Sequence, residues 1–284
     1  MSKVAIITDS TAYIPDETIQ KLNITVTPQI LIWGEETYQD GVDIQPGEFY
    51  KKLATAKVMP TTSQVAIVTM KNVYEKLLES GHEVLGIFLS AKLSGTMQSA
   101  IQAREMLPKA VDKIAIVDSN TTAMAMGFHA LLAARAARDG ASLKECQSLA
   151  EKAREHTGVF FVVDTLEFLR RGGRIGGAQA LLGSALNIKP LLELRDGRIE
   201  SVEKVRTKSK AIDKMIDLVA EQVGDRKPVR LATLHANAEP EARAALETAS
   251  IRLNPIETVF ASVSPVIGAH TGPGTVGLAY MAGM

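Results

Sequence analysis

The stretch VLGIFLSAKLSGTMQSAIQAREML, residues 84–107, carries the pattern that decides the fold. It begins with an apolar run without polar alternation at residues 84–89 and ends in helical spacing at residues 97–107. A short apolar run of this kind indicates a strand that is covered on both faces. Similar runs occur at residues 4–7, 114–117, 159–163 and 229–234, and helical patterns at residues 121–138, 143–156, 208–223 and 239–252. The alternation predicts an α/β fold with a parallel sheet and a ligand site beyond the carboxyl ends of its strands.

The composition places the chain among ordinary globular proteins. It has 284 residues, of which 46% are hydrophobic and 23% are charged, enough for about two domains. Its single cysteine, Cys146, excludes a disulfide scaffold and a thiolate metal cluster, and it fits a reducing, cytoplasmic location. Basic and acidic residues cancel, so the net charge gives no reason to expect nucleic-acid binding.

A region with a different pattern follows residue 160. Residues 166–171 are predicted to form a helix that stops at Gly172, and a second apolar helix is predicted from Gly176 to Leu186. Residues 191–205, with Asp196-Gly197 in the middle, predict a β-hairpin. We therefore expect a Rossmann-like N-terminal domain at residues 1–160 and a mixed α/β domain at residues 161–284. The last strand is free to return to either domain.

Residues 258–284 contain no Asp, Glu, Lys or Arg, and this length is sufficient to span a bilayer. Pro265, Pro273 and several glycines make an unbroken helix improbable. We expect a buried strand, a glycine-rich loop and a final strand, without stable membrane insertion.

Hydroxyl side chains are concentrated in two predicted loops, Thr61-Thr62-Ser63 and Ser94-Gly95-Thr96. One interpretation is helix capping. The other is an anion site, in which neutral hydroxyls and free amides bind a carboxylate or phosphate without a buried countercharge. The cluster His235-Ala236-Asn237 also follows a predicted strand, and we expect it at the same sheet edge. The chain has no G-x-x-x-x-G-K-[ST] phosphate loop and no G-x-S-x-G nucleophile elbow.

Residues 168–210 contain ten basic and four acidic residues, in a chain that is neutral overall. This excess fits a solvated face. It also fits a docking surface for an acidic partner or a phosphate.

Several motifs, in order along the whole chain, resemble those of the DegV family. The most specific are VDTLEFLRRGGRIG at residues 163–176 and PVIGAHTGPG at residues 265–274. The others are TDSTA at residues 8–12, PTTSQ at 60–64, KLSGT at 92–96, NIKP at 187–190 and HANA at 235–238.

The resemblance implies a two-domain α/β protein that binds one long-chain fatty acid, such as palmitate or oleate, in a tunnel between the domains. It implies that Thr62 and Ser94 hold the carboxylate. Neighbouring hydroxyls or amides are expected to contribute, with an imidazole close to the head group: Thr61, Ser63, Gly95, Thr96 and His270. No metal and no cofactor other than the bound fatty acid is expected.

The resemblance further implies a partner. Some members of the family present the fatty acid to a separate ATP-dependent kinase, which makes an acyl phosphate for phospholipid synthesis. This chain would then be the acyl-carrying, non-catalytic subunit. The candidate docking residues are Arg170, Arg171, Arg174 and Arg206.

Two alternatives stay open. A stand-alone acyl hydrolase would use Ser94 with His270 and an orienting acid, for which Asp9, Asp118 and Asp164 are candidates. A lipid-sensing regulatory protein would use the same basic face for a different partner. A monomer is the default expectation.

Overall fold

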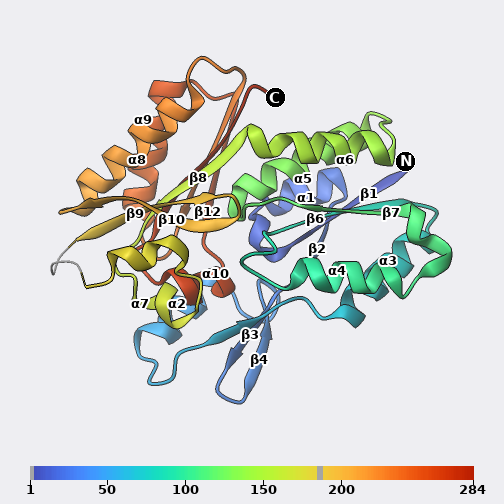
Figure 1. Ribbon diagram of the computed structural model, residues 1–284, viewed down its shortest axis with the longest axis horizontal. Coiled ribbons are helices and arrows are strands. Elements are labelled where there is room, and N and C mark those ends of the chain that lie inside the picture. The colour runs from blue at the N-terminus through green and yellow to red at the C-terminus, as the bar shows by residue number, and fades with distance from the viewer. Residues whose placement is uncertain (1–2, 184–187) are drawn as a thin grey trace.

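Two β-sheets and the helix between them organise the molecule, in a computed structural model that describes residues 3–183 and 188–284 (Figure 1). The first sheet is parallel, with strand order β2-β1-β6-β7. Its strands are β1 (Val4–Asp9), β2 (Thr25–Thr27), β6 (Glu83–Phe88) and β7 (Ile114–Asp118). This confirms the predicted parallel sheet for the N-terminal half of the chain.

The second sheet has six strands in the order β10-β9-β8-β13-β11-β12. They are β8 (Thr157–Val162), β9 (Lys189–Arg195), β10 (Arg198–Val205), β11 (Val229–His235), β12 (Glu257–Ser262) and β13 (Val276–Ala282). Only β11 and β12 are parallel, so this sheet is mixed. All its strands lie between residues 157 and 282, and β13 occupies a central position. The division near residue 160, which falls within β8, stays a prediction.

A small antiparallel sheet, β4-β3-β5, projects from the parallel sheet and was not anticipated from the sequence. It comprises β3 (Ile30–Trp33), β4 (Glu36–Gln39) and β5 (Thr61–Ser63). These strands are three or four residues long, too short for a clear alternation pattern. Their importance is positional, because β5 carries Thr62.

The α-helices cover both sheets (Figure 1). In the first half they are α1 (Asp16–Leu22), α2 (Pro46–Ala54), α3 (Ile67–Glu79), α4 (Thr96–Glu105), α5 (Ala123–Arg138) and α6 (Leu143–Lys152). In the second half they are α7 (Glu167–Arg171), α8 (Lys208–Val223), α9 (Glu239–Leu253) and α10 (Pro265–Thr271). Four short 3₁₀ helices complete the described chain: η1 (Ser10–Ala12), η2 (Pro108–Lys113), η3 (Ala153–Glu155) and η4 (Gly176–Leu181).

Helix α5 joins the two sheets, because it contacts β1 of the first and β13 of the second. Its sequence, AMAMGFHALLAARAAR, is rich in small apolar residues and is buried on most sides. Residue 127 of this helix is glycine because η1 approaches closely there: an added Cβ would lie 2.5 Å from the carbonyl oxygen of Ala12. The amino-terminal end of α5 lies in the space between the sheets.

Local turn chemistry was predicted correctly. Helix α7 ends at Arg171, immediately before Gly172, as expected. The hairpin β9–β10 turns at Asp196 and Gly197, whose φ angles of 50° and 76° are those of a tight primed turn. The expected apolar helix from Gly176 to Leu186 is a 3₁₀ helix that ends at Leu181, and its residues 184–186 lie outside the described residues.

The prediction for residues 258–284 was wrong in one respect. The strands β12 and β13 are present, but α10 replaces the expected glycine-rich loop at residues 265–271. Pro265 lies in its first turn, where a helix tolerates proline because the missing N–H has no intrahelical partner. Among the described residues, no helix combines the length and the apolar character needed to cross a bilayer.

Candidate functional site

A largely apolar cavity lies between the two sheets, and we call it the main cavity. The volume open to the centre of a water-sized sphere inside it is about 150 Å³. The apolar walls come from the loop after β6, from β8, β9 and β11, and from α10, and include Leu89, Val159, Phe161, Leu194, Leu234 and Ile267. The carboxyl end of β6 opens onto it, as expected for a ligand site in a parallel sheet.

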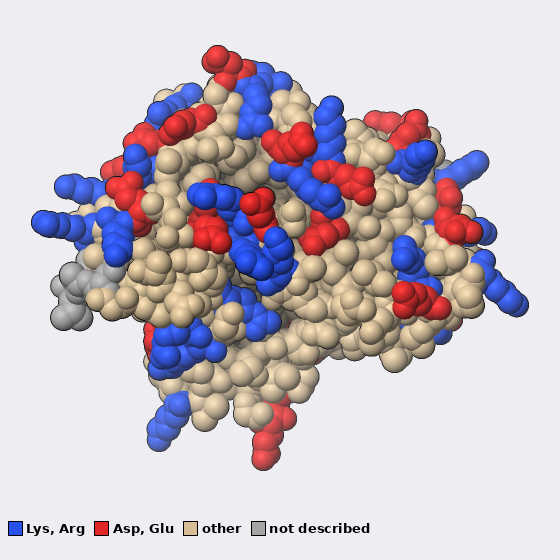
Figure 2. All heavy atoms as spheres, in the orientation of Figure 1, with Lys and Arg blue, Asp and Glu red and all other residues tan. Residues whose placement is uncertain are grey.

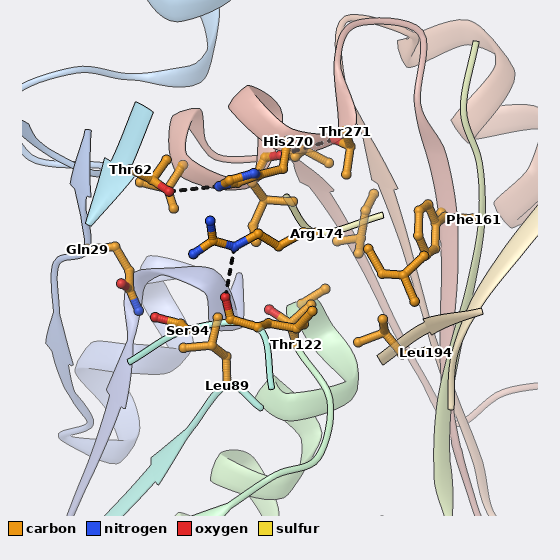
Figure 3. Close-up of a pocket in the computed structure, with 18 of the residues that line it drawn as sticks. Gln29, Thr62, Leu89, Ser94, Thr122, Phe161, Arg174, Leu194, His270 and Thr271 are labelled. Carbon is orange, nitrogen blue, oxygen red and sulfur yellow. Dashed lines mark hydrogen bonds between the residues drawn. The ribbon is translucent and has the colours of Figure 1, made fainter. Parts of the chain in front are cut away.

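One end of the main cavity is polar. Figure 3 shows Gln29, Thr62, Ser94, Arg174 and His270 converging there from five separate segments. The Thr62 Oγ1 and His270 Nε2 atoms are 2.7 Å apart, which is a hydrogen bond between residues 208 positions apart in the chain. The structure therefore brings together Thr62, Ser94 and His270, which were candidates for carboxylate binding, and Arg174, which was a docking candidate. We call the set of Gln29, Thr62, Ser94, Arg174 and His270 the polar cluster.

Strand β5 orients its hydroxyls in alternation. Thr62 is half-buried and opposite Leu31 of β3, whereas Thr61 and Ser63 are exposed. Ser63 still lines the rim of the main cavity, and Thr61 faces outward. Thr62 is thus the hydroxyl of the Thr61-Thr62-Ser63 run that reaches His270.

Ser94 is held by a buried network that the sequence did not reveal. Its Oγ lies 3.1 Å from Thr96 Oγ1, and Thr96 in turn exchanges hydrogen bonds with the Gln29 amide. Thr96 is fully buried, so its hydroxyl supports Ser94 from behind. Gly95 allows this packing, because an added Cβ would lie 2.8 Å from the Gln64 side chain.

Arg174 lies between the two hydroxyl groups (Figure 3). Its Nε donates to the carbonyl oxygen of Leu93 at 3.1 Å, and its Nη1 donates to that of Gly172 at 2.8 Å. These bonds hold the guanidinium at the polar end of the main cavity. The sequence predicted an anion site built from neutral groups alone and named Arg174 as a docking residue, whereas the structure places this guanidinium beside the hydroxyls. Which of these groups bind an anion stays a prediction.

His270 is neutral near pH 7. Burial first, and the positive charge of Arg174 second, lower the pKa of His270 to about 4. Its Nδ1 is buried and has no hydrogen-bond partner among the described residues. The imidazole packs against Gly172, where an added Cβ would lie 2.0 Å from that nitrogen. A neutral imidazole in this setting exchanges hydrogen bonds and carries no charge.

A buried carboxylate fixes the helix that carries His270. Asp40 accepts hydrogen bonds from Ser10 Oγ at 2.7 Å and from the backbone N–H of Val266 at 3.2 Å, in the first turn of α10. Burial raises its pKa to about 6, against the opposing effect of the Ser10 hydrogen bond. Asp40 links the N-terminal half of the chain to α10.

A second cavity, with about 250 Å³ by the same measure, adjoins the polar cluster from outside, and we call it the outer cavity. Thr62, Arg174 and His270 line both cavities. Arg171 lines only the outer one. The polar cluster is consequently accessible from two sides, one apolar and one open toward the basic segment.

The candidate docking arginines divide into two groups. Arg170, Arg171 and Arg206 are exposed, whereas Arg174 is half-buried in the main cavity. Arg170 and Arg171 pair with Glu167 at 2.8 Å and 2.6 Å, and their hydrogen bonds lower the pKa of that carboxyl to about 2. Acidic side chains are interleaved with basic ones on the face shown in Figure 2. The basic excess of residues 168–210 is thus partly offset by neighbours outside that segment.

His235 does not join the cluster, contrary to expectation. Its ring packs against Phe260 with centroids 5.1 Å apart, and its Nε2 lies 3.3 Å from Ser262 Oγ. It belongs to the β11–β12 side of the second sheet and does not line the main cavity.

Comparison with known proteins gives consistent results. The family model described as an uncharacterised protein of the DegV family matches residues 3–283. A DegV domain-containing protein of Streptomyces coelicolor is 41% identical over 277 residues, covering 97% of each chain. A Thermus thermophilus DegV family structure, described in terms of fatty acid binding, has a TM-score of 0.93 and 34% identity, covering 99% of this chain and all of that one. The Bacillus subtilis DegV structure, described as a fatty acid binding protein, has a TM-score of 0.89 and 35% identity over the same shares.

Proposed function

Because the chain belongs to the DegV family, we propose that it binds one long-chain fatty acid in the main cavity. The carboxylate lies at the polar cluster, and the tail lies along the apolar walls. The observation that carries this proposal is an apolar cavity whose polar end combines hydroxyls, a neutral imidazole and one guanidinium. Such an asymmetric lining matches a molecule with a single anionic end.

The tail supplies most of the binding free energy. About 0.8 kcal/mol per buried methylene gives roughly 11 kcal/mol for a tail of about 14 methylenes, before the cost of immobilisation. The head group must be satisfied as it leaves water, because a buried unpaired carboxylate is costly. In our proposal Thr62, Ser94 and Arg174 donate to it, and His270 orients Thr62. Ser63 and the Gly95 backbone lie at the edge of this arrangement, and Thr61 faces the outer cavity.

The direct test is denaturing solvent extraction of the purified protein, followed by mass spectrometry of the extract. We expect one equivalent of free fatty acid, or uptake of one equivalent of palmitate or oleate by delipidated protein. An empty extract together with no uptake would overturn the proposal and restrict the family likeness to the fold.

The first prediction concerns the two hydroxyls. Thr62→Ala or Ser94→Ala should each weaken fatty acid binding about tenfold without abolishing it, since a hydrogen bond to a charged group contributes about 1.5 kcal/mol. The tail should stay bound while the carboxylate loses its fixed position. Titration with a fluorescent fatty acid measures the affinity. A ¹³C-carboxyl-labelled ligand reports the head-group environment by NMR, and an unchanged carboxyl signal in the double alanine variant would remove both hydroxyls from the site.

We further propose that the bound carboxylate is presented to a separate ATP-dependent kinase, so that this chain is a carrier and not itself the catalyst. Two features support this view. The outer cavity gives access to the polar cluster without passing through the apolar walls. It is bordered by Arg171, and exposed Arg170 lies beside it in α7. An acidic surface or a nucleotide phosphate is the natural complement of such a border.

The second prediction addresses this border. Arg171→Glu should lower kinase-coupled formation of acyl phosphate about tenfold and leave fatty acid binding unchanged, because Arg171 does not line the main cavity. Arg138→Glu, at an exposed position at the end of α5, is the matched charge-reversal control. Turnover that is the same in all three proteins would exclude Arg171 from the interface.

The hydrolase alternative is not favoured by the geometry. His270 Nε2 bonds to Thr62, and Ser94 bonds to Thr96, so the described contacts do not form a Ser94–His270 pair. The candidate orienting acids are engaged elsewhere: Asp9 with Thr11 and the Leu89 N–H, Asp118 with backbone N–H groups, and Asp164 with Lys189. A nucleophilic serine needs an adjacent base that is itself oriented. A lipid-sensing role differs from the carrier role only in the partner, and the kinase-coupled assay separates the two.

A further inference from the structure

Gly277 lies in the wall that the second sheet contributes to the main cavity. In the register of the sheet it is directly opposite Leu234 of β11 on one side and Phe161 of β8 on the other. All three residues line the main cavity. Residues directly opposite one another on neighbouring strands point to the same face. Across the wall, the large side chains of Leu234 and Phe161 therefore flank Gly277, which has no side chain.

The packing of the protein itself does not require glycine at this position. Its φ is not in the left-handed region, and an added Cβ would lie 3.5 Å from Phe161 Cβ and 3.8 Å from Leu234 Cβ, ordinary van der Waals distances. Gly272 is the contrasting case, since its φ is 75° and an added Cβ would lie 2.3 Å from the Phe168 ring.

Glycine in the interior of a strand weakens that strand, and it often marks the close approach of a ligand. At Gly277 the room for a side chain is part of the main cavity itself, so the missing side chain leaves a notch between Phe161 and Leu234. The neighbouring walls are apolar, which suits methylene groups and not the carboxylate.

We propose that Gly277 sets the length of the acyl chain that the main cavity accepts, by leaving this notch open to methylenes distal to the carboxylate. The inference rests on the proposed function and extends it to the selection of substrate length. The two hydroxyls proposed to hold the carboxylate lie on β5 and in the loop before α4, and Figure 3 shows Phe161, which borders the notch, across the cavity from Thr62 and Gln29. The notch is in the wall formed by the opposite sheet. A side chain at position 277 would occupy space that a longer tail needs.

The experiment is a competition among saturated fatty acids of increasing length, from laurate to arachidate, for delipidated protein, read out by mass spectrometry of the bound fraction. Gly277→Ala adds one carbon and Gly277→Val adds three. Each methylene that no longer fits should lower the affinity about fourfold, as follows from about 0.8 kcal/mol per methylene. We expect the preferred length to move down by about one carbon in the alanine variant and by two to three in the valine variant.

Two further variants distinguish a change in the preferred chain length from a loss of folded protein. Leu234→Ala, in the same row, should move the preference toward longer chains, because it enlarges the same space. Combining it with Gly277→Val should restore the wild-type preference. If wild type and all the variants bind fatty acids with the same preferred chain length, the inference is overturned and the proposed function stands. Wild-type protein that takes up no fatty acid of the series would overturn both. The alanine variant decides the question if the valine variant does not fold.

Discussion

Replacing Arg174 with leucine should lower the affinity for long-chain fatty acids about 100-fold, which corresponds to about 3 kcal/mol. Arg174 is the guanidinium at the polar end of the main cavity, and two backbone carbonyls hold it in place. Without it, the carboxylate would leave water and meet only neutral groups, namely hydroxyls, the Gln29 amide and the His270 imidazole. An incompletely paired buried charge accounts for a loss of this size.

The ligand itself provides the control for this prediction. Wild-type protein should prefer palmitate to hexadecanol, which has the same tail but no charge. Arg174→Leu should remove most of that preference and bind the alcohol nearly as well as wild type does. A general loss of structure would weaken both ligands equally, and so would contradict the assignment. Arg198→Leu removes an exposed arginine from β10 and should change neither affinity.

Gly172→Ala should lower the free energy of unfolding by about 2–3 kcal/mol and disrupt the polar cluster. The φ of Gly172 is −73°, a value that alanine adopts without strain, so the backbone is not the cause. The cause is the His270 ring, whose Nδ1 would lie 2.0 Å from the new Cβ. The ring must move, and it then loses the hydrogen bond between Nε2 and Thr62 Oγ1.

A double-mutant cycle checks this cause. In a His270→Ala background, Gly172→Ala should leave the free energy of unfolding nearly unchanged, because the imidazole that the new Cβ would clash with is absent. Gly47→Ala, in α2 where an added Cβ would meet nothing within 4 Å, should be neutral in either background. Urea denaturation gives the stabilities. Equal costs with and without the imidazole would show that the collision is not the source.

Local chemistry explains what was predictable about this fold. The Asp196-Gly197 turn and the helix stop at Gly172 depend on a few adjacent residues, and both were located correctly. Helix α10 was missed because its seven residues contain too few turns to show a periodicity. The strands β3, β4 and β5 were missed for the same reason.

The site was only partly accessible to sequence reasoning. Thr62, Ser94 and His270 were marked as candidates by family motifs, and the structure brings them together. The positions of Gln29 and Arg174 at the main cavity depend on contacts between distant segments, such as the hydrogen bond between Gln29 and Thr96, which are 67 residues apart. The residues next to Gln29 and Arg174 in the sequence contain no pattern that predicts these contacts.

The central place of β13 in the second sheet has a consequence for the order of assembly. Its neighbours β8 and β11 precede it by more than a hundred and by about forty residues, and each pairs with it along nearly its whole length. During synthesis both strands are made before the strand that separates them, so each has an unpaired, apolar edge until β13 arrives. The notch at Gly277 is added in the same step. The wall of the main cavity and the pairing at the centre of the second sheet are therefore completed together, when the last strand of this sheet is added.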